Sequence, residues 1–159
     1  MPVFVHTANF NANKKEIWNW YNSDGAFRRI MPEWEGIQPM AAGRLVDGDE
    51  TIFKVKMGPF RQKWVARHHS VIDGESFADR MIKGPFGAWN HNHKFEAGKN
   101  GTTAVVDNVE YKLPLLVRSA PTPGFSIMTG DSRGRRMRGA SSISHTVDVV
   151  SDTFQEIVL

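Results

Sequence analysis

The chain has 159 residues, the length of one globular domain, and it contains no cysteine. The lack of cysteine excludes disulfides, thiolate metal sites and cysteine nucleophiles, and it agrees with a reducing cytoplasm, where we expect the protein. Twenty basic and 17 acidic residues give a net charge of +3, too small to indicate a nucleic-acid or membrane partner by itself. No apolar run approaches the ~20 residues of a membrane span, and the first residues do not read as a signal peptide.

Alternating apolar and polar residues predict that most of the chain is made of strands. The first candidate strand, residues 3–10, is followed by two short helices at residues 14–22 and 25–31, the second ending before Pro32. A weak strand at residues 37–46 comes next. Five further strands are predicted at residues 50–57, 62–72, 77–83, 89–95 and 103–113. Because their connections are too short for parallel crossovers, we expect an antiparallel sheet.

The last part of the chain has a different pattern. Prolines and glycines recur through residues 114–135, which predicts a long connection. After Arg136, apolar residues recur every three or four positions, which predicts one long amphipathic helix. We therefore expect a single α+β domain over residues 1–159, a curved antiparallel sheet of about seven strands with the C-terminal helix across its concave face.

Strand parity predicts which side chains face inward. The odd positions of residues 89–96 are aromatic or imidazole side chains, whereas the even positions are Asn, Lys and Glu. The odd face, with His91 and His93, therefore points inward. The same parity sends Asp107 inward from the last predicted strand and Asp79 inward from the strand before residue 89.

The turn between the last two strands predicts their register. A three-residue loop, Lys99–Gly101, with its glycine left-handed, keeps both odd faces on one side of the sheet, whereas a two-residue loop would not. This register places His93 opposite Asp107, and the preceding turn brings Asp79 near His91. The other expected pairs are Phe95 with Val105, His91 with Val109, and Trp89 with Tyr111.

Two carboxylates and two imidazoles on a mostly apolar face need a reason, since isolated buried charge is costly. Three explanations stay open. The groups form a structural network that satisfies itself, or they fix the polar end of a ligand in a cavity, or they bind a metal. No helical His-x-x-x-His or comparable spacing supports a metal, so we expect neither a metal nor a cofactor.

The run Gly84-Pro-Phe-Gly-Ala-Trp-Asn-His-Asn-His-Lys-Phe95, followed by Asp107-Asn-Val-Glu-Tyr111, resembles the SRPBCC or START-like superfamily, in particular its bacterial ligand-binding group. The resemblance is good over about residues 51–115. It implies a helix-grip fold, in which a seven-stranded sheet and a long C-terminal helix enclose a cavity for lipids, polyketides or other hydrophobic molecules. Some members of the superfamily are cyclases or aromatases, some are carriers or sensors, and some are fused to nucleotide-sugar-epimerase-like proteins. The motif positions that match are Trp89, His91, His93, Asp107 and Tyr111.

The leading hypothesis is that the protein, a monomer or homodimer, binds a small hydrophobic molecule, lipid- or polyketide-like, in this cavity. The expected binding residues are the inward side chains of the strands and two from the C-terminal helix. They are Phe53, Val55, Met57, Trp64, Phe77, Asp79, Met81, Trp89, His91, His93, Phe95, Asp107, Val109, Tyr111, Ile143 and Val147.

Two alternatives remain. His93, held by Asp107, would be the acid/base pair of a cyclase- or dehydratase-like enzyme. No nucleophile elbow, phosphate loop or dinucleotide fingerprint accompanies the pair, so the sequence leaves catalytic activity open. A nucleic acid or an acidic partner would instead contact a basic run, although no nucleic-acid-binding motif accompanies it. That run is Arg133, Arg135, Arg136 and Arg138.

Overall fold

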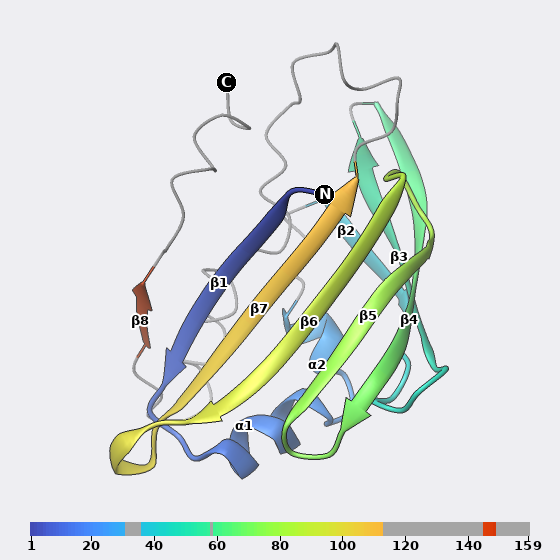
Figure 1. The fold of residues 1–159 in the computed structure, drawn as a ribbon. Coiled ribbons are helices and arrows are strands. Elements are labelled where there is room, and N and C mark those ends of the chain that lie inside the picture. The colour runs from blue at the N-terminus through green and yellow to red at the C-terminus, as the bar shows by residue number, and fades with distance from the viewer. Residues whose placement is uncertain (31–35, 58, 113–144, 149–159) are drawn as a thin grey trace.

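The computed structural model describes residues 1–30, 36–57, 59–112 and 145–148, which form one antiparallel sheet and two short helices (Figure 1). The elements in chain order are β1 (Val3–Phe10), α1 (Lys14–Tyr21), α2 (Ala26–Ile30), β2 (Ile37–Ala41), β3 (Glu50–Met57), β4 (Phe60–Ile72), β5 (Ser76–Lys83), β6 (Ala88–Ala97), β7 (Thr103–Lys112) and β8 (His145–Asp148). Within the described ranges, the sheet order is β2-β3-β4-β5-β6-β7-β1-β8. The seven expected strands and both short helices are therefore confirmed.

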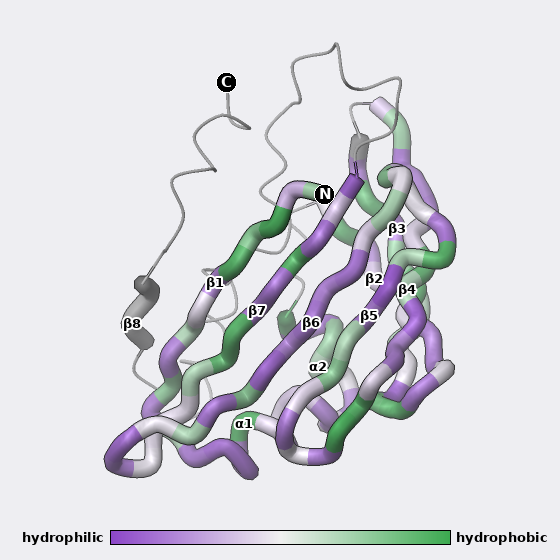
Figure 2. The backbone as a smooth tube through the Cα atoms, viewed as in Figure 1, coloured by the Kyte–Doolittle hydropathy of each residue, from purple (hydrophilic) through white to green (hydrophobic). Residues whose placement is uncertain are grey.

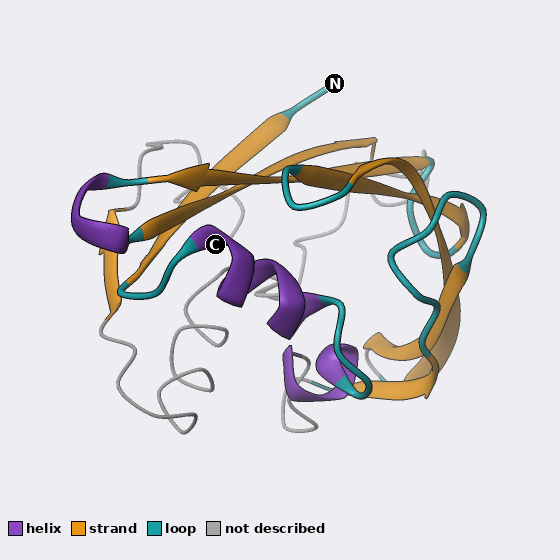
Figure 3. Ribbon diagram, turned by 90° about the horizontal axis from the view of Figure 1, so that it is seen from below, coloured by secondary structure: helices purple, strands orange, loops and turns teal. Residues whose placement is uncertain are grey.

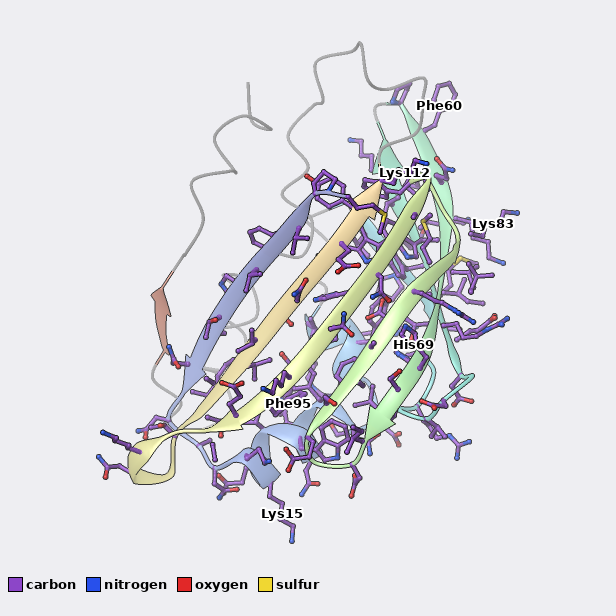
Figure 4. The ribbon with its side chains drawn as sticks, in the orientation of Figure 1. Lys15, Phe60, His69, Lys83, Phe95 and Lys112 are labelled. Atoms are coloured by element: carbon purple, nitrogen blue, oxygen red, sulfur yellow. The ribbon has the colours of Figure 1, made fainter. Side chains whose placement is uncertain are left out.

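Helix α1 begins at a capping box. The side chain of Asn13 accepts a hydrogen bond from the backbone of Glu16 at 3.0 Å, and Glu16 accepts one in return from the backbone of Asn13 at 3.2 Å. The helix is held to the sheet by Trp18, whose indole N–H donates to Asp73 at 2.8 Å. The Trp18 ring also packs edge-on against Phe95, with centroids 5.3 Å apart, at the end of β6 beside α1 (Figure 4).

The sheet is strongly curved, and both helices lie on its concave side (Figure 3). Part of the curvature comes from irregular pairing of β4 with β5, where the register shifts after Val65 and again between His69 and Ile72. Ser70, inside the second shift, has a left-handed φ of 53°. An extra residue on one strand bends it and increases its twist, so these positions help the sheet to close around the helices.

Burial alternates residue by residue along β6 and β7, as a sheet with one buried face requires, although β6 is hydrophilic along most of its length (Figure 2). The buried side chains form two clusters. The first joins α1 to β1, β5, β6 and β7 and contains Ala8, Phe10, Ile17, Trp18, Tyr21, Phe77, Phe95 and Val105. The second lies between β2, β3, β4, β6 and β7 and contains Ile37, Phe53, Val55, Trp64, Ala66, Trp89 and Val109.

The predicted register of β6 and β7 is confirmed. His93 pairs with Asp107, Phe95 with Val105, His91 with Val109, and Trp89 with Tyr111. The loop Lys99–Gly101 joins the strands, and Gly101 has the expected left-handed backbone, with φ of 74°. Asn100 is left-handed as well, with φ of 56°.

The end of β2 differs most from the predictions, and the other strand boundaries agree to within two residues. β2 ends at Ala41 rather than at residue 46, because the chain turns between Arg44 and Asp49, where the backbone N–H of Asp49 donates to the carbonyl of Val46. The backbone N–H of Arg44 donates to the carboxylate of Asp49 at 3.1 Å, which closes the loop before β3. β4 begins at Phe60, two residues earlier than expected, and Phe60 is exposed at the tip of the hairpin (Figure 4).

Most of the predicted C-terminal region lies outside the described residues, including the connection at residues 114–135, Ile143 and the four arginines of the basic run. Four residues of the predicted helix are described. They form β8, which pairs with β1 so that Val147 lies opposite Ala8. Over these four residues, the helix prediction is wrong, because the open edge of β1 supplies the hydrogen-bond partners and the β-branched Thr146 and Val147 suit a strand. No helix in the described ranges has the length and apolar character needed to cross a membrane.

Candidate functional site

A cavity of about 140 Å3 lies between the sheet and the helices. One wall is formed by the end of α1, the turn after it and α2, and another by the loop at residues 42–45. The remaining walls are inward side chains of β3, β4, β5 and β6. Aromatic rings and buried polar groups meet here, since Tyr21, Phe53 and Phe77 lie beside His68 and His93.

Strand alternation and register bring the polar wall together. Residues two apart share a face, so Phe77 and Asp79 both project into the cavity from β5, as His91 and His93 do from β6. The pairing of β5 with β6 places Asp79 opposite His91 and Phe77 opposite His93. On the other side of β5, His68 lies opposite Asp79. The expectation that Asp79 lies near His91 is therefore confirmed.

His93 lies between two carboxylates. Its Nδ1 is 2.6 Å from Oδ1 of Asp107, a short hydrogen bond between buried groups, and its Nε2 is 3.4 Å from Oδ2 of Asp79. Asp107 is only 1% exposed, and it lies behind the imidazole rings rather than on the cavity wall. The tautomer and orientation of His93 are therefore set from behind by Asp107, while its other nitrogen faces Asp79.

His91 makes a similar approach to the same two carboxylates. Its Nδ1 is 3.9 Å from Oδ2 of Asp79, and its Nε2 is 3.4 Å from Oδ1 of Asp107. The rings of His91 and His93 are neighbours, with centroids 3.8 Å apart. A third imidazole, His6 of β1, has its Nδ1 3.9 Å from the other oxygen of Asp107.

Burial and nearby charges shift the pKa values in this cluster, so that His91 and His68 favour the neutral form and Asp79 favours the charged form. Burial, reinforced by the neighbouring His93, lowers the pKa of His91 despite the attraction of Asp107 and Asp79. Burial also lowers the pKa of His68. Burial opposes ionisation of Asp79, but the hydrogen bond to His93 and the nearby imidazoles outweigh it, so the pKa of Asp79 lies below its usual value. At neutral pH, the cavity wall thus presents a carboxylate beside neutral His91 and His68.

The predicted binding residues divide into three groups. Those that line the cavity are Phe53, Phe77, Asp79, His91 and His93. A second group is packed in the sheet, outside the cavity lining: Val55, Trp64, Met81, Trp89, Phe95, Asp107, Val109 and Tyr111. The side chains of Met57, Ile143 and Val147 lie outside the described part of the structure.

The second group faces inward as predicted, and where Trp64, Trp89 and Tyr111 lie, aromatic rings pack against one another. Trp64 and Trp89 meet edge to face with centroids 5.2 Å apart, and Phe86 packs on Trp89 at the same distance. Tyr111 completes this packing, with its ring 6.2 Å from Phe86. At this end of the concave face, the described side chains pack against one another and are not among those that line the cavity.

Several cavity residues were missed by the sequence analysis. Thr51 and His68 share the face of the predicted Phe53 and Trp64, so the same parity would have included them. Their side chains are linked, with Thr51 Oγ1 3.2 Å from Nε2 of His68. The walls contributed by residues 22–25 and 42–45 come from connecting segments, which carry no periodic signal.

No family model matches the sequence, and no curated protein sequence matches it. Solved structures do. A nucleoside-diphosphate sugar epimerase from Corynebacterium glutamicum matches with a TM-score of 0.58 and 28% identity, over 72% of this chain but only 25% of that chain. The present chain thus spans about a quarter of that protein.

Two further neighbours match over most of their own length. Norcoclaurine synthase from Thalictrum flavum, in complex with dopamine and hydroxybenzaldehyde, has a TM-score of 0.62 and 16% identity, over 87% of this chain and 83% of that chain. A protein from Thermus thermophilus has a TM-score of 0.58 and 13% identity, over 74% of this chain and 82% of that chain. Together with the curved antiparallel sheet, these neighbours show that the described part of the chain matches a helix-grip fold, whose long C-terminal helix falls outside the described residues.

Proposed function

We propose that the chain is a START-like (SRPBCC) domain that binds a small hydrophobic molecule with one polar end. The observation that carries this proposal is the cavity itself, in which aromatic side chains surround a single buried polar cluster. Protein interiors are close-packed, and a concave apolar space with a few convergent polar groups is typical of small-molecule sites. Asp79, His91 and His93 would orient the polar end of the ligand, and Phe53 and Phe77 would contact its apolar part.

The volume of the cavity limits the size of the ligand. A cavity of about 140 Å3 is close to the roughly 150 Å3 of an engineered protein cavity that binds benzene. We therefore expect the described cavity to hold one ring, such as the ring end of a polyketide- or lipid-like molecule. The norcoclaurine synthase structure contains dopamine and hydroxybenzaldehyde, which supports the use of this fold for small ring compounds with polar substituents.

The test is to fill the cavity without disturbing the polar cluster. Ala66 is buried on the cavity wall, so Ala66→Phe should occupy the space that the ligand needs. Binding of an apolar fluorescent probe, such as anilinonaphthalene sulfonate, and of phenol or 4-hydroxybenzaldehyde by calorimetry is measured for the wild type and the variant. Ile82→Phe, at an exposed position, is the control and should bind like the wild type. A folded wild-type protein that binds none of these compounds would contradict the proposal.

The 2.6 Å contact between His93 and Asp107 favours a second candidate function, acid/base catalysis on a bound carbonyl compound. A buried carboxylate that holds one imidazole nitrogen leaves the other directed at the cavity wall. The test is exchange of the α-C–H protons of cyclohexanone in D2O, followed by NMR. His93→Gln should abolish the acceleration, whereas His68→Gln, another cavity imidazole, should retain most of it. No acceleration by the wild type would exclude this reaction.

A further inference from the structure

Two buried imidazoles and one half-buried carboxylate on the cavity wall converge like the ligands of a metal ion. Asp79, His91 and His93 each offer one ligand atom, and these atoms all lie within 4.8 Å of one another. Oδ2 of Asp79 is 3.4 Å from Nε2 of His93 and 3.9 Å from Nδ1 of His91. All three come from paired positions of β5 and β6, so rigid strands rather than loops fix their spacing.

These separations are close to those of a loaded site. In a tetrahedral site with bonds of about 2.0–2.2 Å, neighbouring ligand atoms are roughly 3.4 Å apart. The Asp79 to His93 separation already has this value, and the Asp79 to His91 separation exceeds it by about half an ångström. All three ligand atoms lie within 4.8 Å of one another, so side-chain rotations that draw the two imidazole nitrogens together would complete the set.

A second observation is the position of Asp107 behind the rings. Histidine ligands of metals almost always direct their other nitrogen at a carboxylate or carbonyl oxygen, which fixes the tautomer and the ring orientation. Oδ1 of Asp107 is 2.6 Å from Nδ1 of His93 and 3.4 Å from Nε2 of His91. One carboxylate thus approaches the far nitrogen of both rings, and the near nitrogens are those that face Asp79.

We propose that Asp79 Oδ2, His91 Nδ1 and His93 Nε2 bind a divalent transition-metal ion, with Asp107 as the residue that positions both imidazoles. Two imidazoles and a carboxylate suit zinc, cobalt or iron(II) better than magnesium or calcium, which prefer oxygen ligands alone. Three protein ligands leave at least one coordination position open, as in metal sites that take part in catalysis. Because all three residues line the cavity, that position faces the space for a small molecule.

The proposed metal site is independent of the small-molecule binding proposed above. The test therefore uses protein to which no organic compound has been added. Chelator-treated protein is titrated with CoCl2 and followed by visible absorption, and with ZnCl2 followed by calorimetry. We expect one ion per chain and the intense visible bands of four- or five-coordinate cobalt. Magnesium and calcium at the same concentrations should not compete.

Substitutions test which residues bind the metal ion. Asp79→Asn, His91→Gln and His93→Gln should each weaken cobalt and zinc binding by at least about 100-fold, and Asp107→Asn by about 10–100-fold. The controls are Asp24→Asn, a carboxylate elsewhere on the cavity wall, and His69→Gln, an imidazole outside the cavity lining; both should bind like the wild type. Circular dichroism and thermal melting establish that each variant is folded.

One measurement uses the wild-type protein alone, so its outcome does not depend on whether the variants fold. In protein labelled with 15N in histidine, zinc should shift the ring resonances of His93 and His91 and leave those of His69 in place. The proposal is overturned if the wild type binds no cobalt or zinc in a saturable way. It is also overturned if zinc shifts only other histidines, or if the folded ligand variants bind as tightly as the controls.

Discussion

The imidazole of His93 stacks on the ring of Phe77, with centroids 4.2 Å apart and planes inclined by 20°. Cross-strand pairing of β5 with β6 creates this contact, and it covers one face of the imidazole while Asp107 and Asp79 occupy its edges. Phe77 is therefore both a core residue and the side chain that holds the polar cluster in one orientation.

Replacing Phe77 by Ala should destabilise the domain by about 3–5 kcal/mol, because truncating a buried aromatic side chain removes apolar contacts and enlarges a cavity that the fold cannot collapse. Phe77→Leu should cost considerably less, since most of the volume is kept. Urea denaturation provides both values. If Phe77→Ala costs less than about 1 kcal/mol, the ring is not packed as described.

Asp107→Asn should preserve the fold, because amide and carboxylate have nearly the same shape, and should lower stability by about 1–3 kcal/mol through loss of a charge-assisted hydrogen bond. A double-mutant cycle with His93→Gln isolates the interaction, and we expect a coupling energy of about 1 kcal/mol or more. The matched cycle of Asp107→Asn with His69→Gln should be additive. Additivity in the first cycle as well would show that the two side chains do not interact in solution.

Acid should destabilise the protein through its buried imidazoles. Because burial lowers the pKa of His68 and of His91, the unfolded chain takes up protons more readily than the folded one as the pH falls through the ordinary value of 6.5. The stability that depends on these groups is therefore fully present above about pH 6.5 and declines below it. His68→Gln should flatten the free energy of unfolding between pH 7 and pH 5, measured with a chelator present, whereas His69→Gln should leave the slope unchanged.

Asp79 should contribute to acid sensitivity in a lower pH range. Its pKa is lowered in the fold, so its contribution to stability is present above the ordinary value of 3.8 and is lost as the pH falls through the folded value. Asp79→Asn should therefore weaken the pH dependence below about pH 4. The same unfolding experiment checks it, and an unchanged slope in that range would mean that Asp79 has no favourable interaction with the imidazoles.

The length of the loop Lys99–Gly101 should determine whether the polar cluster forms. Gly101→Ala should cost about 1–2 kcal/mol, because φ is 74° there and a side chain is disfavoured in left-handed backbone, although there is space for the added carbon. Deleting Lys99 is a different change. A one-residue slip would turn the inward residues of one strand to the outer face, so the deletion variant should lose cooperative unfolding rather than shift its midpoint slightly.

The sequence predicts those features of the site that depend on neighbouring residues, and it does not predict those that depend on packing between distant segments. The pairing of His93 with Asp107 follows from strand parity and one short loop, both of which are local, and it is confirmed. Parity shows which face a residue occupies, but it does not show where along that face the space is filled. Trp89 and Tyr111 were therefore expected in the cavity, whereas in the described structure they pack with Phe86 and are not among the residues that line it.

The other walls of the cavity depend on tertiary packing. Residues 22–25 and 42–45 reach it because α1 docks through Trp18 and because the chain turns at Asp49, and neither event leaves a repeating pattern in the sequence. Likewise, apolar spacing around Val147 favoured a helix, whereas the edge of β1 provides a strand partner for the same residues. A hydrogen-bonding edge that lies far away in the chain outweighs local periodicity here.

The place of β1 in the sheet has a consequence for how the chain folds. β1 pairs with β7, so Val3 lies opposite Glu110, and 107 positions separate the partners in the chain (110 minus 3). The loop-closure entropy of such a distant contact has to be overcome before the contact stabilises anything, which slows folding. During synthesis, the backbone edge of β1 that pairs with β7 therefore has no strand partner until β7 has been made.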